Sequence, residues 1–162
     1  RAMPPRKPAP PELTPAGRLE EAGPLKVLGY QLAQAEIVTS TVFREQVGEP
    51  FGLRPVEYTV LTLIEENPGG SLARLARALA VTAPHITAMI DRLEGKGLVA
   101  RSQSEADRRT QVLRTTRKGS DLVRQATRRI IDAEREALPL TPGEHAMLVE
   151  LLHKVAAARP AR

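Results

Sequence analysis

Apolar residues between positions 25 and 157 recur at alternating steps of three and four, which is the spacing of one face of an α-helix. The first such face predicts a long helix from Pro24 to the sequence GEPFG at 48–52. The members of this face are mostly apolar: Leu25, Leu28, Leu32, Ala35, Thr39, Val42 and Gln46. A second helix is predicted from Pro55, which suits a first helical turn, to the break at NPGG, residues 67–70.

Two shorter helices are predicted after this break. The first reads SLARLARALA, with Ser71 as its N-cap. The second starts TAPHITAMIDRLEGKG, with Thr82 as its N-cap and Pro84 in its first turn, and it stops at Gly95 and Gly97. The side chains expected to be buried are Leu72, Leu75 and Leu79 in the first helix and Ile86, Met89, Ile90 and Leu93 in the second. The second helix therefore has one apolar face and one face of small and polar residues.

The pattern then changes from helical to strand-like. Two β-prone runs, LVARSQ and TQVLRTT, flank the polar loop SEADRR, which predicts a hairpin with a long, mobile tip. A further helix is predicted from Lys118-Gly119 to about Ala137. A last one follows Thr141, where TPGE combines an N-cap, a first-turn proline and a capping-box acid. The fold class predicted is mainly α with a small β-wing.

The composition narrows the possible chemistry. The chain has no cysteine, so disulfides, thiol redox sensing and zinc–thiolate sites are excluded. Aromatic residues make up only 2%, so the core must consist of leucine, valine, isoleucine and alanine, which favours helices. No apolar run approaches the ~20 residues of a membrane span, and the N-terminus lacks the apolar centre of a signal peptide. Residues 1–24 hold seven of the fourteen prolines and predict a flexible arm or, alternatively, an arm that packs on a partner subunit.

The positive charge is concentrated in the middle of the chain. Between Ser71 and Gly119 there are ten Lys/Arg and four Asp/Glu, a net charge of +6, whereas the remaining fourteen basic and fifteen acidic residues give −1. This concentration indicates a polyanionic partner. A basic surface that only contacts solvent would explain the charge equally well.

The order of these elements is that of a winged helix-turn-helix. A helix that enters the major groove needs small or polar residues on its exposed N-terminal turns, because base edges must be approached closely. The candidate recognition residues are Thr82, Ala83, Pro84, His85, Thr87 and Ala88. At the hairpin tip, Arg108 and Arg109 are candidates for the narrow, negative minor groove. Asp107 is expected to hold the tip by accepting hydrogen bonds or pairing with an arginine such as Arg101. The competing interpretation is a disordered polar loop.

At this point the sequence resembles the MarR family of transcriptional regulators. The resemblance is carried by residues 75–119, LARALAVTAPHITAMIDRLEGKGLVARSQSEADRRTQVLRTTRKG, in which DRLEGKGLV is followed at a specific distance by DRR and TRKG. It implies a homodimer that reads a pseudo-palindrome in double-stranded DNA, with half-sites roughly 10 bp apart. The expected regions are an arm at 1–24, a helical dimerisation region at 25–52 and 119–157, and a DNA-binding winged helix-turn-helix domain at 53–118.

The resemblance also implies a small-molecule effector, namely an aromatic carboxylate, a phenol or a related acyl-CoA thioester. The candidate effector-binding residues are Tyr30, Gln31, Gln34, Arg44 and Tyr58, whose polar groups and rings suit such ligands. Alternatively, the tyrosines belong to the core or an interface and the glutamines contact solvent. Together with the composition, the family implies a cytoplasmic bacterial or archaeal protein associated with the nucleoid, with no membrane partner.

Catalytic and metal sites find little support in the sequence. No nucleophile-elbow serine and no Gly-rich phosphate loop is present. His145 and His153 lie eight residues apart, which is longer than the adjacent-turn spacing of metal-binding helices. We therefore expect no enzyme activity, no catalytic residue, no metal and no cofactor. The alternative function is a winged-helix module for protein–protein contact without a small-molecule effector.

Overall fold

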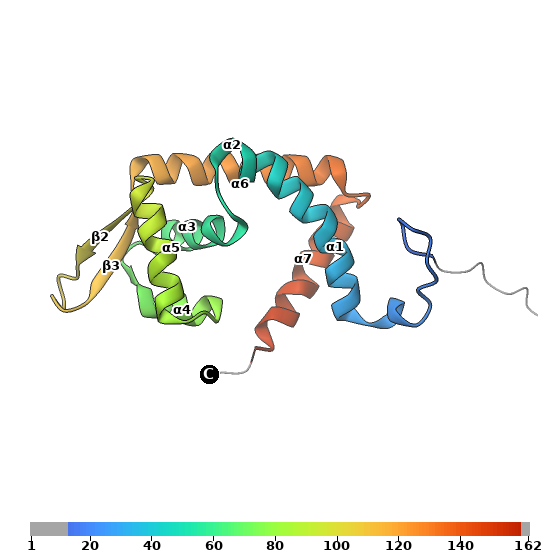
Figure 1. Ribbon diagram of the computed structural model, residues 1–162, viewed down its shortest axis with the longest axis horizontal. Coiled ribbons are helices and arrows are strands. Elements are labelled where there is room, and N and C mark those ends of the chain that lie inside the picture. Colours follow the sequence, from blue (N-terminus) through green and yellow to red (C-terminus); the bar gives the residue numbers. More distant parts are fainter. Residues whose placement is uncertain (1–12, 160–162) are drawn as a thin grey trace, which may run out of the picture. The chain divides into compact units, whose positions relative to one another are not determined.

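The computed structural model describes residues 13–159, which form two compact units, one up to Thr41 and one from Val42 (Figure 1). The first unit contains a hooked segment and most of helix α1 (Leu28–Phe43). In the hook, Leu13 forms a β-bridge with Glu20, and the Thr14 amide donates to the Leu19 carbonyl at 2.9 Å. Residues 1–12 of the expected arm lie outside the described range, so the flexible arm stays a prediction.

The start of the first helix differs from the sequence-based prediction. Pro24–Lys26 form a 3₁₀ turn, and Val27 has an extended backbone conformation (φ −90°, ψ 112°), so the α-helix begins at Leu28 rather than at Pro24. The Val27 amide donates back to the Pro24 carbonyl, which closes the 3₁₀ turn. Apolar periodicity did not reveal this break, because a 3₁₀ turn at a helix end keeps side chains on nearly the same face.

The second unit contains the rest of the chain and confirms the mainly helical class with a small sheet (Figure 1). A π-helical turn, Arg44–Gly48, continues from α1. The remaining elements are α2 (Glu49–Phe51), α3 (Pro55–Glu66), β1 (Gly70–Ser71), α4 (Leu72–Leu79), α5 (Ala83–Gly95), β2 (Val99–Gln103), β3 (Gln111–Thr115), α6 (Arg117–Ala137) and α7 (Pro142–Ala157). Within residues 13–159, no helix is both long enough and apolar enough to cross a membrane.

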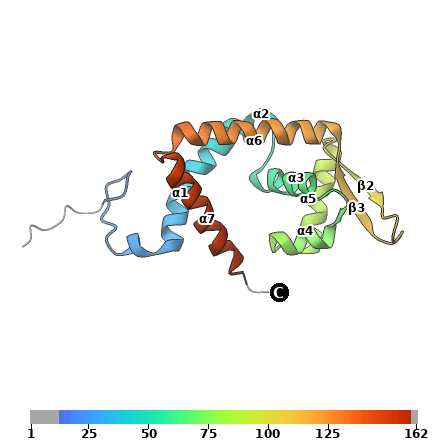
Figure 2. The ribbon, with the colours of Figure 1, turned by 180° about the vertical axis from the view of Figure 1, so that it is seen from behind.

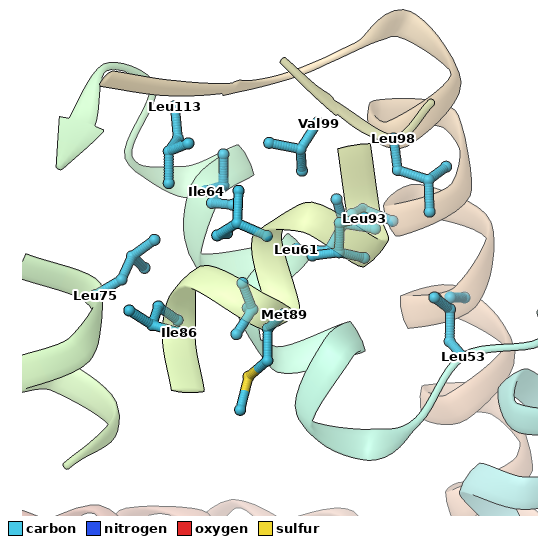
Figure 3. Packing of buried hydrophobic residues seen from close by; sticks show 14 of the residues in the cluster. Leu53, Leu61, Ile64, Leu75, Ile86, Met89, Leu93, Leu98, Val99 and Leu113 are labelled. Carbon is cyan, nitrogen blue, oxygen red and sulfur yellow. The ribbon is translucent and has the colours of Figure 1, made fainter. Parts of the chain in front are cut away.

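A single apolar core joins α3, α4, α5 and the sheet (Figure 3). The predicted stripe of α5 is buried, since Ile86, Met89, Ile90 and Leu93 are all at most 2% exposed. Burial of each such side chain contributes about 1.5–3 kcal/mol. The packing therefore fixes which face of α5 remains in solvent.

The sheet has three antiparallel strands in the order β1-β3-β2. The predicted hairpin is confirmed, with Val99 opposite Thr115 and Gln103 opposite Gln111. Strand β1 was not predicted. It forms because Gly69, at φ +84°, turns the chain so that its amide donates to the Leu113 carbonyl at 2.8 Å. The NPGG sequence thus ends α3 and also adds an edge strand to the wing.

Helix capping agrees with the sequence at two of three predicted positions. The Ser71 hydroxyl accepts from the Arg74 amide, and Thr141 forms a reciprocal capping box with Glu144. Thr82 has the extended conformation of an N-cap, but its side chain makes no capping bond. Thr116, which was not predicted, caps α6 by accepting from the Gly119 amide, so α6 begins at Arg117.

The structure explains why the TRKG sequence ends in a glycine, Gly119. It is buried in the first turn of α6, and a Cβ built on it would overlap the backbone carbonyl oxygen of Leu98. The Thr116 amide donates to the same carbonyl at 3.0 Å. The start of α6 can therefore approach the residue before β2 only because position 119 has no side chain.

We expect Gly119→Ala to destabilise the protein by about 1–3 kcal/mol, because backbone atoms must move to accept the new methyl group. The matched control is Gly95→Ala at the end of α5, where an added Cβ meets nothing within 4 Å. That substitution should be neutral or stabilising by up to about 1 kcal/mol. Thermal unfolding of both variants tests this, and equal melting temperatures would contradict it.

Candidate nucleic-acid interface

The N-terminal half of α5 presents its small and polar side chains to solvent. The proposed recognition residues are all exposed: Thr82, Ala83, Pro84, His85, Thr87 and Ala88. On the opposite face, Ile86 and Met89 are 1% and 2% exposed. The helix therefore has the two-faced character that reading a groove requires, with its apolar face held by the core.

The two threonines on this face differ in their hydrogen bonding. The Thr87 hydroxyl donates to the Ala83 carbonyl at 2.9 Å, so its proton is used within the helix and its oxygen is left as an acceptor. Thr82 makes no capping bond, so its hydroxyl can both donate to and accept from an external partner. Small hydroxyl side chains of this kind suit base edges and phosphates alike.

The tip of the hairpin is organised around Asp107. One carboxylate oxygen accepts from the Arg109 amide at 3.0 Å, and the other accepts from the Thr110 hydroxyl at 3.0 Å. The Ser104 hydroxyl accepts from the Asp107 amide on the other side of the loop, at 3.4 Å. Asp107 therefore holds the tip through hydrogen bonds, as one of the two sequence-based alternatives expected.

The other alternative, a pair between Asp107 and Arg101, is wrong. Arg101, on β2, instead contacts two acids of α5, with Nη2 2.5 Å from Asp91 and Nη1 2.7 Å from Glu94. The Arg101 side chain is only 20% exposed, whereas the side chains of Asp91 and Glu94 are 57% and 41% exposed, so the arginine is partly buried and both acids remain in contact with solvent. The first wing strand, β2, is thereby linked directly to α5. Sequence reasoning missed these partners, although acids three residues apart share a helix face.

The wing tip and the start of α5 project from the same side of this unit. In both views α5 runs from the neighbourhood of α4 towards the start of α6, and the hairpin tip extends to the side of the unit away from α6 (Figures 1 and 2). Arg108 and Arg109 are exposed at that tip. Within residues 13–159 neither guanidinium has an ion-pair partner, so both charges are available to a polyanion.

The proposed effector residues are divided between the two units. In the first unit the Tyr30 hydroxyl donates to the Glu21 carboxylate at 2.7 Å, and Gln31 donates to the Leu25 carbonyl at 2.7 Å. The bond to Glu21, with burial and the negative charge, raises the pKa of Tyr30 above its usual value. Gln34 is half-buried.

In the second unit the Tyr58 hydroxyl shares a 2.7 Å hydrogen bond with Thr127, which joins α3 to α6. The Tyr58 ring packs against Phe43 with the ring centres 5.8 Å apart. Arg44 is exposed and pairs with Glu45 and Glu49. Within the described part of the chain, no group of three or more histidine, aspartate or glutamate residues is arranged to hold a metal ion.

Comparisons with known proteins agree with this geometry. The sequence pattern of the MarR family matches residues 53–110. The HTH-type transcriptional repressor Rv2887 of Mycobacterium tuberculosis is 30% identical over 132 residues, which are 79% of this chain and 92% of that protein. A putative transcriptional regulatory protein for the hcr operon of Thauera aromatica is 29% identical over 129 residues, covering 79% of this chain and 78% of the relative.

Solved structures of transcriptional regulators are also similar to this chain. The transcriptional repressor CouR bound to a 23-mer DNA duplex is 30% identical and superposes with a TM-score of 0.76, covering 85% of this chain and 98% of CouR. A cysteine-to-serine mutant of MarR from E. coli in complex with operator DNA is 27% identical, with a TM-score of 0.68 and coverage of 79% and 92%. These relatives regulate transcription, a role without catalysis. The chain described here belongs to the MarR family of winged helix-turn-helix, DNA-binding transcriptional regulators.

Proposed function

We propose that this protein is a repressor that binds a pseudo-palindromic operator as a homodimer and leaves it when a small aromatic effector binds. The observation that carries the DNA-binding part is the common orientation of two exposed features, the start of α5 and the unpaired arginines at the wing tip (Figures 1 and 2). The first suits a major groove and the second the adjoining minor groove. Residues 53–118 would form this DNA-binding domain.

In this proposal the exposed face of α5 reads base edges. Thr82 and Thr87 supply hydroxyl groups, and His85 supplies an imidazole that can donate or accept. Ala83, Pro84 and Ala88 are small enough to let the helix backbone come close to the bases. The alanine methyls also suit contact with the methyl group of thymine.

The wing arginines are expected to contribute mainly through charge. We expect Arg108→Ala and Arg109→Ala each to weaken operator binding, and the double variant to lower the slope of log affinity against log salt by about two. Fluorescence anisotropy with a labelled duplex at several salt concentrations measures both quantities.

The control for these variants is Arg135→Ala, which removes the same charge from the far end of α6, where Arg135 pairs with Asp132. It should leave the salt slope almost unchanged. A double wing variant that binds like wild type would exclude the wing from the interface.

The homodimer is supported by an apolar surface on α7 that the rest of its own unit, residues 42–159, does not cover. The exposed apolar residues of this helix are Met147, Leu148, Val149, Leu151, Leu152 and Val155. Isolated exposed apolar residues are normal, but six within nine positions indicate a surface that another chain covers. Residues 25–52 and 119–157 would provide the dimerisation region.

We expect Leu152→Glu to convert the dimer to monomers and to weaken operator binding, because a buried charge at an apolar interface is costly. Sedimentation equilibrium measures the mass directly. The control is Glu150→Gln on the same helix, which removes only an exposed pair with Lys154. If the wild-type protein sediments as a monomer, the homodimer is excluded.

For the effector, we propose that it binds better to a conformer in which the two DNA-binding lobes are wrongly spaced. DNA affinity then falls by the ratio of the two ligand affinities. The candidate contacts remain Tyr30, Gln31, Gln34, Arg44 and Tyr58. The polar and aromatic character of these side chains suits aromatic carboxylates, phenols and acyl-CoA thioesters.

A thermal-shift screen of aromatic acids and their thioesters should find a ligand that raises the melting temperature. At a ligand concentration of 100 times Kd, binding adds about 2.7 kcal/mol to the free energy of unfolding. Tyr58→Phe should reduce this shift, whereas Thr127→Val should keep it. Both variants lose the same internal hydrogen bond, but only the first loses the phenol. Equal shifts in the two variants would remove Tyr58 from the ligand contacts.

A further inference from the structure

Glu57 is the only buried carboxylate in residues 42–159, with 1% of its surface exposed. It lies in the first turn of α3, on the face that meets α5. An isolated buried carboxylate costs several kcal/mol, so its charge must be compensated by its neighbours. The groups that neutralise the Glu57 carboxylate therefore indicate which elements this charge holds together.

Three basic side chains surround this carboxylate. Arg92 of α5 places Nε 2.8 Å from Oε1, and Lys96, at the C-cap of α5, places Nζ 3.4 Å from Oε2. Arg54 lies further away, with Nε 3.8 Å from Oε1, although its amide donates to Oε2 at 3.1 Å. The two closest cations both come from the last turns of the recognition helix. The four residues Arg54, Glu57, Arg92 and Lys96 are called the Glu57 cluster below.

The surroundings keep Glu57 ionised. Burial by itself raises the pKa of the Glu57 carboxyl, but the Arg54 amide and the Arg92 and Lys96 side chains outweigh burial and hold that pKa below its usual value. Charge-assisted hydrogen bonds of this kind are short and directional. Because such bonds are directional, they restrict rotation and sliding of α5 in addition to the packing of its apolar face.

The cluster also reaches the segment that connects α1 to α3. Lys96 Nζ donates to the Gly52 carbonyl at 2.6 Å. Gly52 ends α2 in a left-handed conformation, at φ +61°, so its carbonyl has a fixed direction. The end of the recognition helix is therefore tied both to α3 and to the turn that precedes α3.

We propose that Glu57 is a positioning residue for DNA reading, which sets the orientation of α5 relative to α3 through Arg92 and Lys96. The proposal rests on the DNA-binding role of α5 proposed above. Glu57 itself lies in the interior of the fold and touches no nucleic acid. Its effect should appear in sequence discrimination, because only base contacts need the exact orientation of α5.

The direction in which Glu57→Gln changes DNA affinity distinguishes a positioning role for Glu57 from a general effect of charge. Glu57→Gln keeps the shape of the side chain and removes one negative charge, so the net charge rises by one. If long-range charge decided the outcome, binding to every duplex would become tighter. If Glu57 positions α5, binding to the operator becomes weaker in spite of the added positive charge.

The experiment compares two probes: a duplex selected by the wild-type protein from a randomised library, and a random-sequence duplex of the same length. For Glu57→Gln we expect operator affinity to fall about tenfold, roughly the value of one base contact. Affinity for the random duplex should stay level or rise. Arg92→Ala should lower the ratio of the two affinities similarly, and the double variant should lose no more than the worse single variant.

A stability control is required, because Glu57→Gln also weakens the fold. Ile64→Val lies on the same helix. Ile64 is 1% exposed in the wild type, so removing one of its methyl groups should lower the melting temperature without changing any contact of the Glu57 cluster. It should leave the ratio of operator to random affinity unchanged.

An unchanged or tighter operator complex with Glu57→Gln would overturn the positioning role. The positioning role would also be overturned if Ile64→Val lowered the ratio of operator affinity to random-duplex affinity as much as Glu57→Gln does. It would be overturned as well if the losses of that ratio in Glu57→Gln and Arg92→Ala added up in the double variant. A wild-type protein that selects no duplex at all would instead overturn the DNA-reading proposal itself, and the role of Glu57 with it.

Discussion

The burial of one face of α5 is the constraint on which the rest of the structure depends. Ile86, Met89, Ile90 and Leu93 enter the core shared by α3, α4 and the sheet (Figure 3). Because a helix has only one opposite face, this packing determines which residues meet solvent. Polar contacts then refine the arrangement, with Arg101 holding the wing to α5 and Glu57 holding α3 to the end of α5. The apolar core thus holds the elements together, and the ion pairs fix their relative orientation.

Local patterns in the sequence were sufficient to predict most elements. The period of three and four located α3 to α7, and the two β-prone runs located the hairpin. Ser71 and Thr141 were recognised as caps because their signals lie within three residues of the helix start. The six exposed positions from Thr82 to Ala88 followed from the same logic, since an apolar stripe defines the opposite face. The family itself was recognised from the specific order of DRLEGKGLV, DRR and TRKG.

The features that were missed depend on contacts between distant residues. Glu57 meets Arg92 and Lys96 across 35 and 39 positions, and nothing in the local sequence distinguishes it from a solvent-exposed glutamate. Arg101 could have paired with either Asp91 or Asp107, and only the path of β2 past α5 decides between them. Strand β1 is two residues long and depends on the backbone conformation of Gly69. Periodicity describes one element at a time, so it cannot select partners between elements.

The scarcity of aromatic residues has a practical consequence for spectroscopy. The chain has no tryptophan and two tyrosines, so Tyr30 and Tyr58 carry its near-ultraviolet fluorescence. One lies in each compact unit, and each hydroxyl has a different partner, the Glu21 carboxylate or the Thr127 hydroxyl. A phenol bonded to a carboxylate is quenched more strongly than one bonded to an alcohol. Emission from the unlabelled protein should therefore come mainly from Tyr58, which makes it an intrinsic optical reporter of the junction between α3 and α6.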